Sequence, residues 1–237
     1  MPKSDTTKYT KTGHRRVRRG NAEDAAHLKA TLIMAAHDLF ANGGLNAVTM
    51  RNLASRAEVA AMTPYNYFSS KADLLWHLKN DILRVMLDDQ KAAVISCSSA
   101  REKLWVSTRD YMRYWLSKPE QYRLMYLPMS LDGDEILTNH HVSDETSLMR
   151  DFQIQLVKEF AIETGGNPDY ALLTSNFRHA AVLGIIHLHF VNPALMGDMN
   201  TAADAFSTLV VDSVEKILKK QMTNEEVLRL TPRAPMN

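Results

Sequence analysis

The fold is decided by residues 49–75, which read TMRNLASRAEVAAMTPYNYFSSKADLL. Thr49 is a good N-cap for a first short helix, in which Leu53 and Ala57 are apolar at helical spacing. Residues 69–73 read SSKAD, which predicts the start of another helix through a capping box with Asp in place of the usual Glu. Two short helices and a tight turn before a longer helix are the layout of a helix-turn-helix that reads DNA.

We expect the second helix of this motif to run from Ala60 to Tyr67. Pro64 falls within its first turn or at the edge of that turn, where the missing N–H costs least. The small side chains of Ala60 and Ala61 allow the helix N-terminus to approach the floor of a major groove. Other residues that can reach bases or phosphates are Thr49, Arg51, Met62, Thr63, Tyr65, Asn66, Tyr67 and, on the next helix, Lys71.

This stretch resembles the DNA-binding domain of the TetR (tetracycline repressor) family of bacterial transcription regulators. Residues 35–54 read AAHDLFANGGLNAVTMRNLA, with the family's Leu-Phe pair, its Gly-Gly stop and its Thr cap. Residues 65–71 read YNYFSSK and are followed by Leu74-Leu75, close to the family's Tyr-x-His/Tyr-Phe-x-x-Lys-x-x-Leu.

The resemblance implies a role for several of these residues. Phosphate contacts would come from Thr63, Tyr65 and Lys71, and operator preference from Ala60, Ala61, Met62 and Asn66. Pro64 stands where the family usually has Leu, and Ala60-Ala61 replace a more polar pair. Direct reading of bases therefore rests on Arg51, Asn66 and a basic N-terminal arm.

The positive charge of the chain lies at its N-terminal end. The net charge of the whole protein is only +1, but residues 1–80 hold 12 Lys and Arg against 6 Asp and Glu. The first 20 residues carry seven basic residues and a single acid, with too few apolar residues to fold alone. One hypothesis is that Arg15, Arg16, Arg18 or Arg19 enters a minor groove, and the alternative is a solvated tail that adds only nonspecific attraction.

Composition and periodicity predict an all-α protein with two domains. We expect a basic flexible arm at 1–24, a helix-turn-helix domain at 25–85 with the motif at about 48–67, an effector-binding and dimerisation domain at 86–222, and a tail at 223–237. Helices are predicted at 25–41, 71–95, 101–117, 119–127, 142–164, 169–190 and 202–218, with no β-strand. The single cysteine, Cys97, fits a reducing cytoplasm, and no apolar run is long enough to span a membrane.

The last two helices carry apolar stripes that predict a twofold homodimer. TetR relatives dimerise through their last two long helices. A symmetric operator needs two copies of the helix-turn-helix domain, which we call the reader. A monomeric bundle capped by this helix pair is the alternative. The predicted interface residues are Leu172, Leu183, Ile186, Phe206, Leu209, Val210, Val214 and Ile217.

The resemblance also implies a small-molecule effector bound among the helices of the second domain. Aromatic and methionine side chains suit an apolar or aromatic effector, although such residues more often fill a core. The candidate lining residues are Trp105, Tyr111, Met112, Trp115, Tyr122, Met125, Tyr126, Met129, Phe152, Phe177 and His179.

Metal and enzyme chemistry find little support. His187 and His189 are two residues apart and so lie on different faces of a helix, and His140-His141 has no cysteine partners. The chain carries no nucleophile elbow, P-loop or dinucleotide fingerprint. We therefore assign no catalytic residue, metal or cofactor.

The sequence thus predicts a homodimeric DNA-binding regulator, more often a repressor than an activator, that leaves a palindromic operator when a small molecule binds. The alternative is a ligand-independent protein that acts by occluding or shaping DNA. It would have the same reader and a second domain without a usable cavity.

Overall fold

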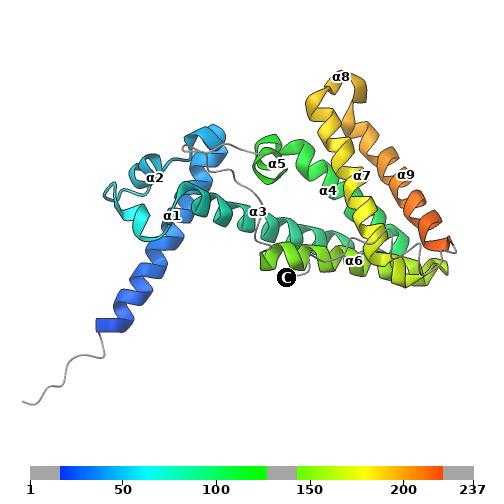
Figure 1. The fold of residues 1–237 in the computed structure, drawn as a ribbon, viewed down its shortest axis with the longest axis horizontal. Helices are drawn as coiled ribbons and strands as arrows, with labels where there is room; N and C mark the ends of the chain where they lie inside the picture. Colours follow the sequence, from blue (N-terminus) through cyan, green and yellow to red (C-terminus); the bar gives the residue numbers. More distant parts are fainter. Residues whose placement is uncertain (1–16, 127–142, 221–237) are drawn as a thin grey trace, which may run out of the picture. The chain divides into compact units, whose positions relative to one another are not determined.

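The computed structural model of the protein describes residues 17–126 and 143–220, and these residues form helices and 3-10 turns without a β-strand. Two compact units divide the chain, Met1–Leu78 and Lys79–Asn237. The division falls inside helix α3 (Lys71–Val94; Figure 1). It comes earlier in the chain than the predicted boundary at 85/86. The predicted all-α fold, with an N-terminal helix-turn-helix and a C-terminal helical domain, is confirmed.

The N-terminal unit packs α1 (Val17–Ala47), α2 (Met50–Arg56), the 3-10 turn η1 (Thr63–Asn66) and the first residues of α3 around one core. The fully buried side chains of this core are those of Leu32, Ala36, Val48, Leu53, Phe68, Leu74, Leu75 and Leu78. Helix α1 is broken at Gly44, whose φ of 61° and ψ of −162° are open essentially only to glycine. This break is the Gly-Gly stop predicted from the sequence.

Helix α1 begins earlier than the sequence predicted. The helix starts at Val17 rather than at about residue 25, so the part of the predicted 1–24 arm from Val17 onward is helical. Alanine, arginine and glutamate favour helix, and once α1 is formed each added residue extends it without a new nucleus. Arg18 and Arg19 thus belong to α1, whereas Arg15, Arg16 and the predicted tail at 223–237 lie outside the described residues.

The second helix of the motif is shorter and tighter than predicted. In place of an α-helix from Ala60 to Tyr67, the chain forms the single 3-10 turn η1. The amide N–H of Tyr65 donates to the Met62 carbonyl at 3.2 Å, and that of Tyr67 to the Pro64 carbonyl at 3.0 Å. Pro64 has no N–H to donate, so a regular α-helical ladder cannot run through this position, and the segment closes with three-residue bonds instead.

The turn between α2 and η1 places Glu58 in the left-handed region, with a φ of 56°. The Val59 N–H donates to the Ala54 carbonyl at 3.0 Å, and the Glu58 N–H donates to the Ser55 carbonyl at 3.3 Å. This pair of bonds is a Schellman motif, in which the position of Glu58 is usually glycine.

Replacing Glu58 with glycine is therefore expected to stabilise the N-terminal unit by about 0.5–1 kcal/mol, because a side chain in the left-handed region is strained. Urea denaturation followed by circular dichroism measures the change. Glu58→Ala is the control, since alanine keeps the Cβ and hence the strain, and it should leave the free energy of unfolding nearly unchanged. Equal stabilisation by both substitutions would contradict this account.

The described part of the C-terminal unit contains the rest of α3 and five further α-helices of at least 8 residues. These are α4 (Ala100–Ser117), α5 (Pro119–Tyr126), α6 (Asp144–Thr164), α7 (Ala171–Val191) and α9 (Met199–Lys219), with the short η2 (Pro168–Tyr170) and α8 (Pro193–Met196) between them. The predicted helices agree with all five within a few residues, and only α8 was not predicted. Residues from α4, α6, α7 and α9 share a core that includes Leu104, Phe160, Ala171 and Val214.

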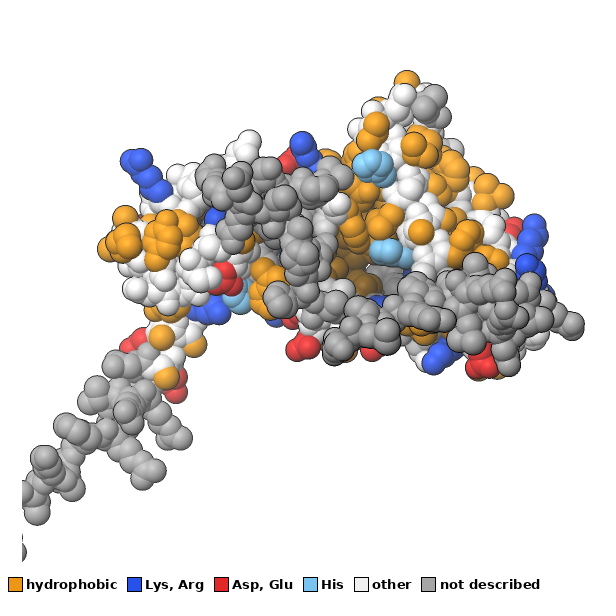
Figure 2. All heavy atoms as spheres, in the orientation of Figure 1, with side chains coloured by type: hydrophobic (Ala, Val, Ile, Leu, Met, Phe, Trp, Pro, Cys, Tyr) orange, Lys and Arg blue, Asp and Glu red, His pale blue; other side chains and the backbone are white. Residues whose placement is uncertain are grey.

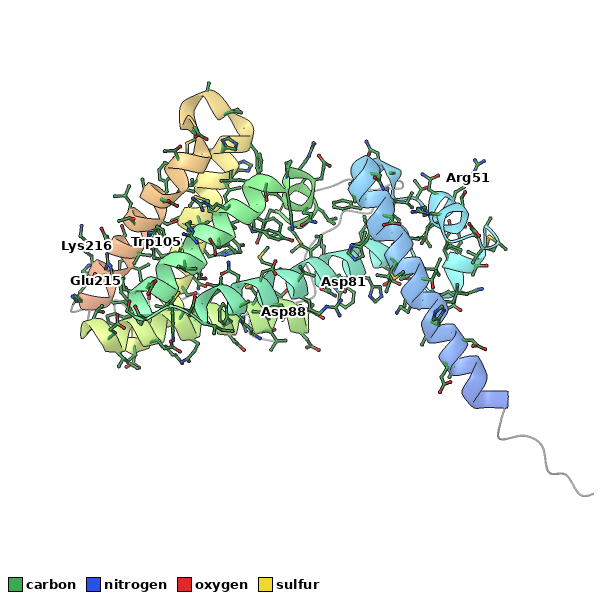
Figure 3. All side chains as sticks on the ribbon, turned by 180° about the vertical axis from the view of Figure 1, so that it is seen from behind. Arg51, Asp81, Asp88, Trp105, Glu215 and Lys216 are labelled. Atoms are coloured by element: carbon green, nitrogen blue, oxygen red, sulfur yellow. The ribbon has the colours of Figure 1, made fainter. Side chains whose placement is uncertain are left out.

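Polar side chains connect α4 to α9 along one surface. We call this surface the α4–α9 seam, and it is made up of the following pairs. Arg101 pairs with Asp212 and Glu215, Trp105 Nε1 donates to Thr208 at 3.0 Å, and Arg113 pairs with Asp204 at 3.0 Å. Trp105 and Glu215 are labelled in Figure 3. Exposed pairs of this kind each contribute little to stability, but in register they fix how α4 lies against α9.

Candidate functional site

The helix-turn-helix presents polar and aromatic side chains to solvent from an anchored backbone. Met62 and Tyr65 expose 69% and 50% of their surface, and Asn66 is exposed as well. Pro64 and Phe68, which alternate with them in the sequence, are buried. Because the 3-10 turn is held from inside by Pro64 and Phe68, it can offer its outer side chains to a partner without losing its own packing.

The remaining predicted DNA-binding residues lie on the surface or at its edge. Arg51 points outward from α2 (Figure 3). Ala60 and Ala61 are exposed, and their small side chains leave room for a partner to approach η1. Half-buried positions are taken by Thr49, Thr63, Tyr67 and Lys71.

Side-chain caps fix the ends of the helices that carry these residues. The Thr49 hydroxyl accepts a hydrogen bond from the Asn52 N–H at 3.1 Å, so Thr49 is the predicted N-cap of α2. The Ser70 hydroxyl accepts from the Asp73 N–H at 3.2 Å, and the Asp73 carboxylate accepts from the Ser69 N–H at 2.8 Å. The predicted capping box with Asp is therefore formed, and it places Lys71 in the first turn of α3.

In the C-terminal unit, part of the predicted effector-lining set does come together. We call it the aromatic cluster: its rings lie with centroids 5.0–6.3 Å apart and belong to Tyr111, Trp115, Tyr122, Tyr126, His179 and Phe190. Phe190 was not predicted. The hydroxyls of Tyr111 and Tyr126 lie 2.5 Å apart, and burial raises the pKa of both, so both keep their protons at neutral pH.

The other predicted lining residues lie elsewhere. Trp105 belongs to the α4–α9 seam, and Phe152 packs beside the core formed by α4, α6, α7 and α9. Phe177 is 40% exposed on α7. Met112 and Met125 are buried, and Met129 lies outside the described residues. Spacing along one helix could not separate these positions, because their neighbours come from helices distant in sequence.

A buried polar network that sequence reasoning missed lies in the same unit, and we call it the Arg178 network. Its members, each at most 7% exposed, are Gln90, Ser107, Thr108, Gln153 and Arg178. Arg178 Nη1 donates to Thr108 Oγ1 at 3.0 Å and Nη2 donates to Gln153 Oε1. The Ser107 hydroxyl lies 2.6 Å from the Gln90 amide and donates to Gln153 at 3.3 Å. The available signal was that Arg178 is the only Lys, Arg, Asp or Glu of α7.

A groove of about 490 Å³ opens between α3 and α4 within the C-terminal unit. It is lined by Met86, Asp89, Gln90, Asp110, Arg113, Tyr114 and Ser117. Burial, and then the charge of Asp89, raise the pKa of Tyr114 to about 12. The groove is therefore lined by two carboxylates, the Arg113 guanidinium and a neutral phenol.

Comparison with known proteins relates the N-terminal unit to a described family. Residues 32–78 match the family described as bacterial regulatory proteins, tetR family. The helix-turn-helix lies entirely within this match. The chain carries a TetR-family domain.

The TetR-family similarity extends to individual proteins. The chain is 40% identical over 76 residues to the HTH-type transcriptional regulator BetI of Agrobacterium fabrum, which covers 32% of this chain and 36% of BetI. The chain thus spans about a third of the length of the relative that it matches. Regulators of this family are in general DNA-binding proteins without enzymatic activity.

Solved structures show that the TetR-like fold extends over most of the chain. A possible TetR family transcriptional regulator from Streptomyces coelicolor A3(2) superposes with a TM-score of 0.59 at 18% identity, covering 80% of this chain and 99% of the other. The transcriptional regulator FadR from Bacillus subtilis, in complex with stearoyl-CoA, superposes with a TM-score of 0.54 at 16% identity, covering 77% and 97%. At these identities the likeness concerns the fold alone.

The last two long helices of this TetR-like fold expose apolar side chains. Figure 2 shows hydrophobic groups gathered over α7 and α9. Leu172, Leu188 and Val191 of α7 expose 39%, 50% and 67% of their surface, and Leu209 of α9 exposes 61%. Exposed apolar groups concentrated on one pair of helices are typical of an interaction surface.

The predicted interface residues divide between this surface and the interior. Leu172 and Leu209 are exposed, and Leu183, Phe206 and Ile217 are half-buried. Ile186, Val210 and Val214 are at most 6% exposed within the unit itself, and their part in the interface stays a prediction. They support α7 and α9 from inside, because these helices carry apolar residues on their inner as well as their outer faces.

The described residues hold neither a metal-binding cluster nor a membrane-spanning helix. In residues 17–126 and 143–220, no three His, Cys, Asp or Glu side chains are grouped in a way that would hold a metal ion. Within those same ranges, no helix combines the length and the apolar character needed to cross a membrane.

Proposed function

We propose that the protein is a DNA-binding transcriptional regulator of the cytoplasm, a homodimeric repressor that a small-molecule effector releases from a palindromic operator. The observation that carries this proposal is the exposed side of the helix-turn-helix. Arg51, Tyr65 and Asn66 are exposed, while Leu53, Pro64 and Phe68 of the same segment are buried. A segment anchored on one side and open on the other is what a major groove requires.

The predicted DNA-binding residues divide into two roles. Thr63, Tyr65 and Lys71 contact phosphates and fix the position of the unit on DNA, without discriminating between sequences. Arg51 and Asn66 read base edges, since their side chains pair well with guanine and adenine, respectively. The basic residues at the N-terminus, including Arg15, Arg16, Arg18 and Arg19, reach the adjacent minor groove and strengthen binding to all sequences.

Two copies of the reader are joined through the exposed side of α7 and α9. Leu172, Leu188 and Leu209 supply the apolar contact, which an isologous interface repeats twice. A twofold dimer places two readers on half-sites about 34–36 Å apart, so the operator is a palindrome.

The effector binds in the C-terminal unit, at the aromatic cluster. One protein of the same fold, FadR of Bacillus subtilis, was solved with stearoyl-CoA, which supports ligand binding by folds of this type. Release from DNA follows if the effector binds better to the conformation in which the two readers no longer match successive major grooves.

A ligand-independent occlusion protein is the second candidate, favoured by the close packing of the aromatic cluster. The rings of Tyr122 and Tyr126 lie 5.2 Å apart, and Trp115 is fully buried among them, as in a filled core. Thermal denaturation against a panel of small molecules separates the two candidates. A compound that stabilises the protein and lowers its DNA affinity supports the effector, and a panel without any such compound favours occlusion.

Replacement of Lys71 by alanine tests the DNA-binding face. We expect weaker binding to every duplex by a similar factor. The slope of log affinity against log salt should become shallower by about 0.9 for each phosphate that Lys71 neutralises in the wild type. Fluorescence anisotropy on random-sequence and selected duplexes at several salt concentrations measures both quantities.

The matched control is Lys91→Ala, an exposed lysine near the other end of α3, which should leave binding unchanged. Asn66→Ala should instead alter the preferred sequence. A Lys71→Ala variant with altered sequence preference and undiminished affinity would show that the phosphate role is wrong.

A further inference from the structure

Arg178 is a buried cation whose hydrogen-bond partners are neutral. It lies on α7 and is 4% exposed, and it donates to Thr108 and Gln153. Its Nε has no hydrogen-bond partner among the described residues, and no carboxylate in these ranges forms an ion pair with it. Arg101 and Arg113 on α4, by contrast, pair with carboxylates at the surface.

The charge of Arg178 persists at neutral pH. Burial lowers its pKa to about 10, which still leaves the guanidinium protonated at pH 7. A buried cation that faces only hydroxyl and amide dipoles has lost its hydration and has gained no opposite charge, which is an unfavourable arrangement. An anion bound beside Arg178 would supply the missing opposite charge.

The surroundings of Arg178 indicate what kind of anion fits. His179, the next residue, and Tyr111 belong to the aromatic cluster, with their ring centroids 5.7 Å apart. His179 and the half-buried Tyr126 give this cluster a side open to solvent. A planar guanidinium matches a carboxylate through two parallel hydrogen bonds, and the neighbouring rings suit an apolar or aromatic body. The groove between α3 and α4 suits an anion less well, because it is lined by Asp89 and Asp110, and its one cation, Arg113, already pairs with Asp204.

We propose that Arg178 binds the carboxylate of a small organic monoacid whose apolar or aromatic part lies against Tyr111 and Tyr126. This inference rests on the proposed function, since it names the chemical class of the effector. The carboxylate would accept a hydrogen bond from the unpaired Nε of Arg178 and compete with Gln153 for the hydrogen bond that Nη2 donates. Gln153 shares a hydrogen bond with Ser107, which in turn contacts Gln90 on α3. The acid would thereby alter contacts of the helix whose first turn carries Lys71.

The test is isothermal titration of the full-length protein with octanoate, benzoate and phenylacetate, each against its uncharged primary amide. We expect at least one acid to bind roughly tenfold or more tightly than its amide, and Arg178→Gln to remove that preference. Arg178→Lys keeps the charge without the planar pair of donors and should retain part of the preference. The control is Arg150→Gln, an exposed arginine of α6, which should bind the acids as the wild type does.

A purely structural role of Arg178 gives a different pattern. Arg178→Gln would then lower the melting temperature and leave the ratio of acid to amide affinity unchanged. That result would overturn the proposal, as would amides that bind as tightly as acids, or an absence of binding by all three acids. Inorganic phosphate binding more tightly than every acid would also overturn the choice of a carboxylate.

Failure of this inference is distinguishable from failure of the proposed function. Acid binding is measured without DNA, and DNA binding is measured without acid. If acids bind through Arg178 and DNA affinity is unchanged, the site stands and effector release fails. If DNA binds specifically and no acid binds, the DNA-binding role stands and the Arg178 site fails.

Discussion

Replacing Phe68 with alanine is expected to lower the free energy of unfolding of the N-terminal unit by about 3–5 kcal/mol and to abolish DNA binding. Phe68 is fully buried and follows η1 directly, with its N–H donating to the Pro64 carbonyl at 2.9 Å. Its ring contacts His77, at a centroid distance of 5.5 Å, and Lys29, whose Nζ lies 5.8 Å from the ring centroid. The substitution leaves a cavity beneath the turn that carries Tyr65 and Asn66.

Urea denaturation of the full-length protein, followed by circular dichroism and by tryptophan fluorescence, measures this loss. Trp76 is in the N-terminal unit, whereas Trp105 and Trp115 are in the C-terminal unit, so Trp105→Phe and Trp115→Phe isolate the signal of the first unit. Tyr65→Ala is the matched control, since Tyr65 is half exposed and its loss should weaken DNA binding with little effect on stability. A Phe68→Ala variant within about 1 kcal/mol of the wild type would contradict the role of Phe68 as the anchor.

Replacing Leu209 with glutamate is expected to convert the dimer into a monomer. Leu209 is 61% exposed on α9, so a charge there costs the isolated unit little. In a twofold interface the substitution occurs twice, and two buried, unpaired carboxylates at about 2 kcal/mol each weaken the dimer roughly a thousandfold. The affinity for a palindromic duplex should fall together with the stability of the dimer, because each reader then binds one half-site alone.

Sedimentation or light scattering at micromolar concentration measures the change in mass. Leu148→Glu is the control, because Leu148 is 55% exposed and belongs to α6 rather than to α7 or α9. It should leave the mass unchanged. A Leu209→Glu protein that stays dimeric would move the interface elsewhere on the surface.

Local signals in the sequence predicted where several helices begin and end. Thr49 caps α2 and Asp73 completes the box at the start of α3 because caps depend on residues within four positions of one another. Helix α4 ends before Pro119, and α6 ends at Gly165, for the same local reasons. Such features need no knowledge of distant parts of the chain.

Features that depend on distant residues were not predicted. Trp105 donates to Thr208 across the α4–α9 seam, and nothing near Trp105 in the sequence identifies that partner. Arg178 meets Thr108 and Gln153 only once α4, α6 and α7 are packed together. Ile186 and Val210 face the interior although their stripe also fits an interface, because helical periodicity marks an apolar face without naming what covers it.

The 3-10 turn η1 lies between these two cases. Pro64 was recognised as a residue for the first turn of a helix, but the sequence did not show that the helix would end with that turn. The buried positions of Pro64 and Phe68 hold the chain inward at both ends of Tyr65–Tyr67. The reader therefore presents a short turn in which Tyr65 and Asn66 are the main polar exposed groups.

Selection of bound sequences from a random pool of DNA duplexes at physiological salt tests the central claim most directly. The account predicts an enriched palindrome with half-sites one helical turn apart, bound roughly 10³-fold or more tightly than scrambled DNA. Selection that enriches no sequence, with binding that fades as salt rises, would contradict a specific dimeric regulator. The basic N-terminus would then account for DNA binding without an operator.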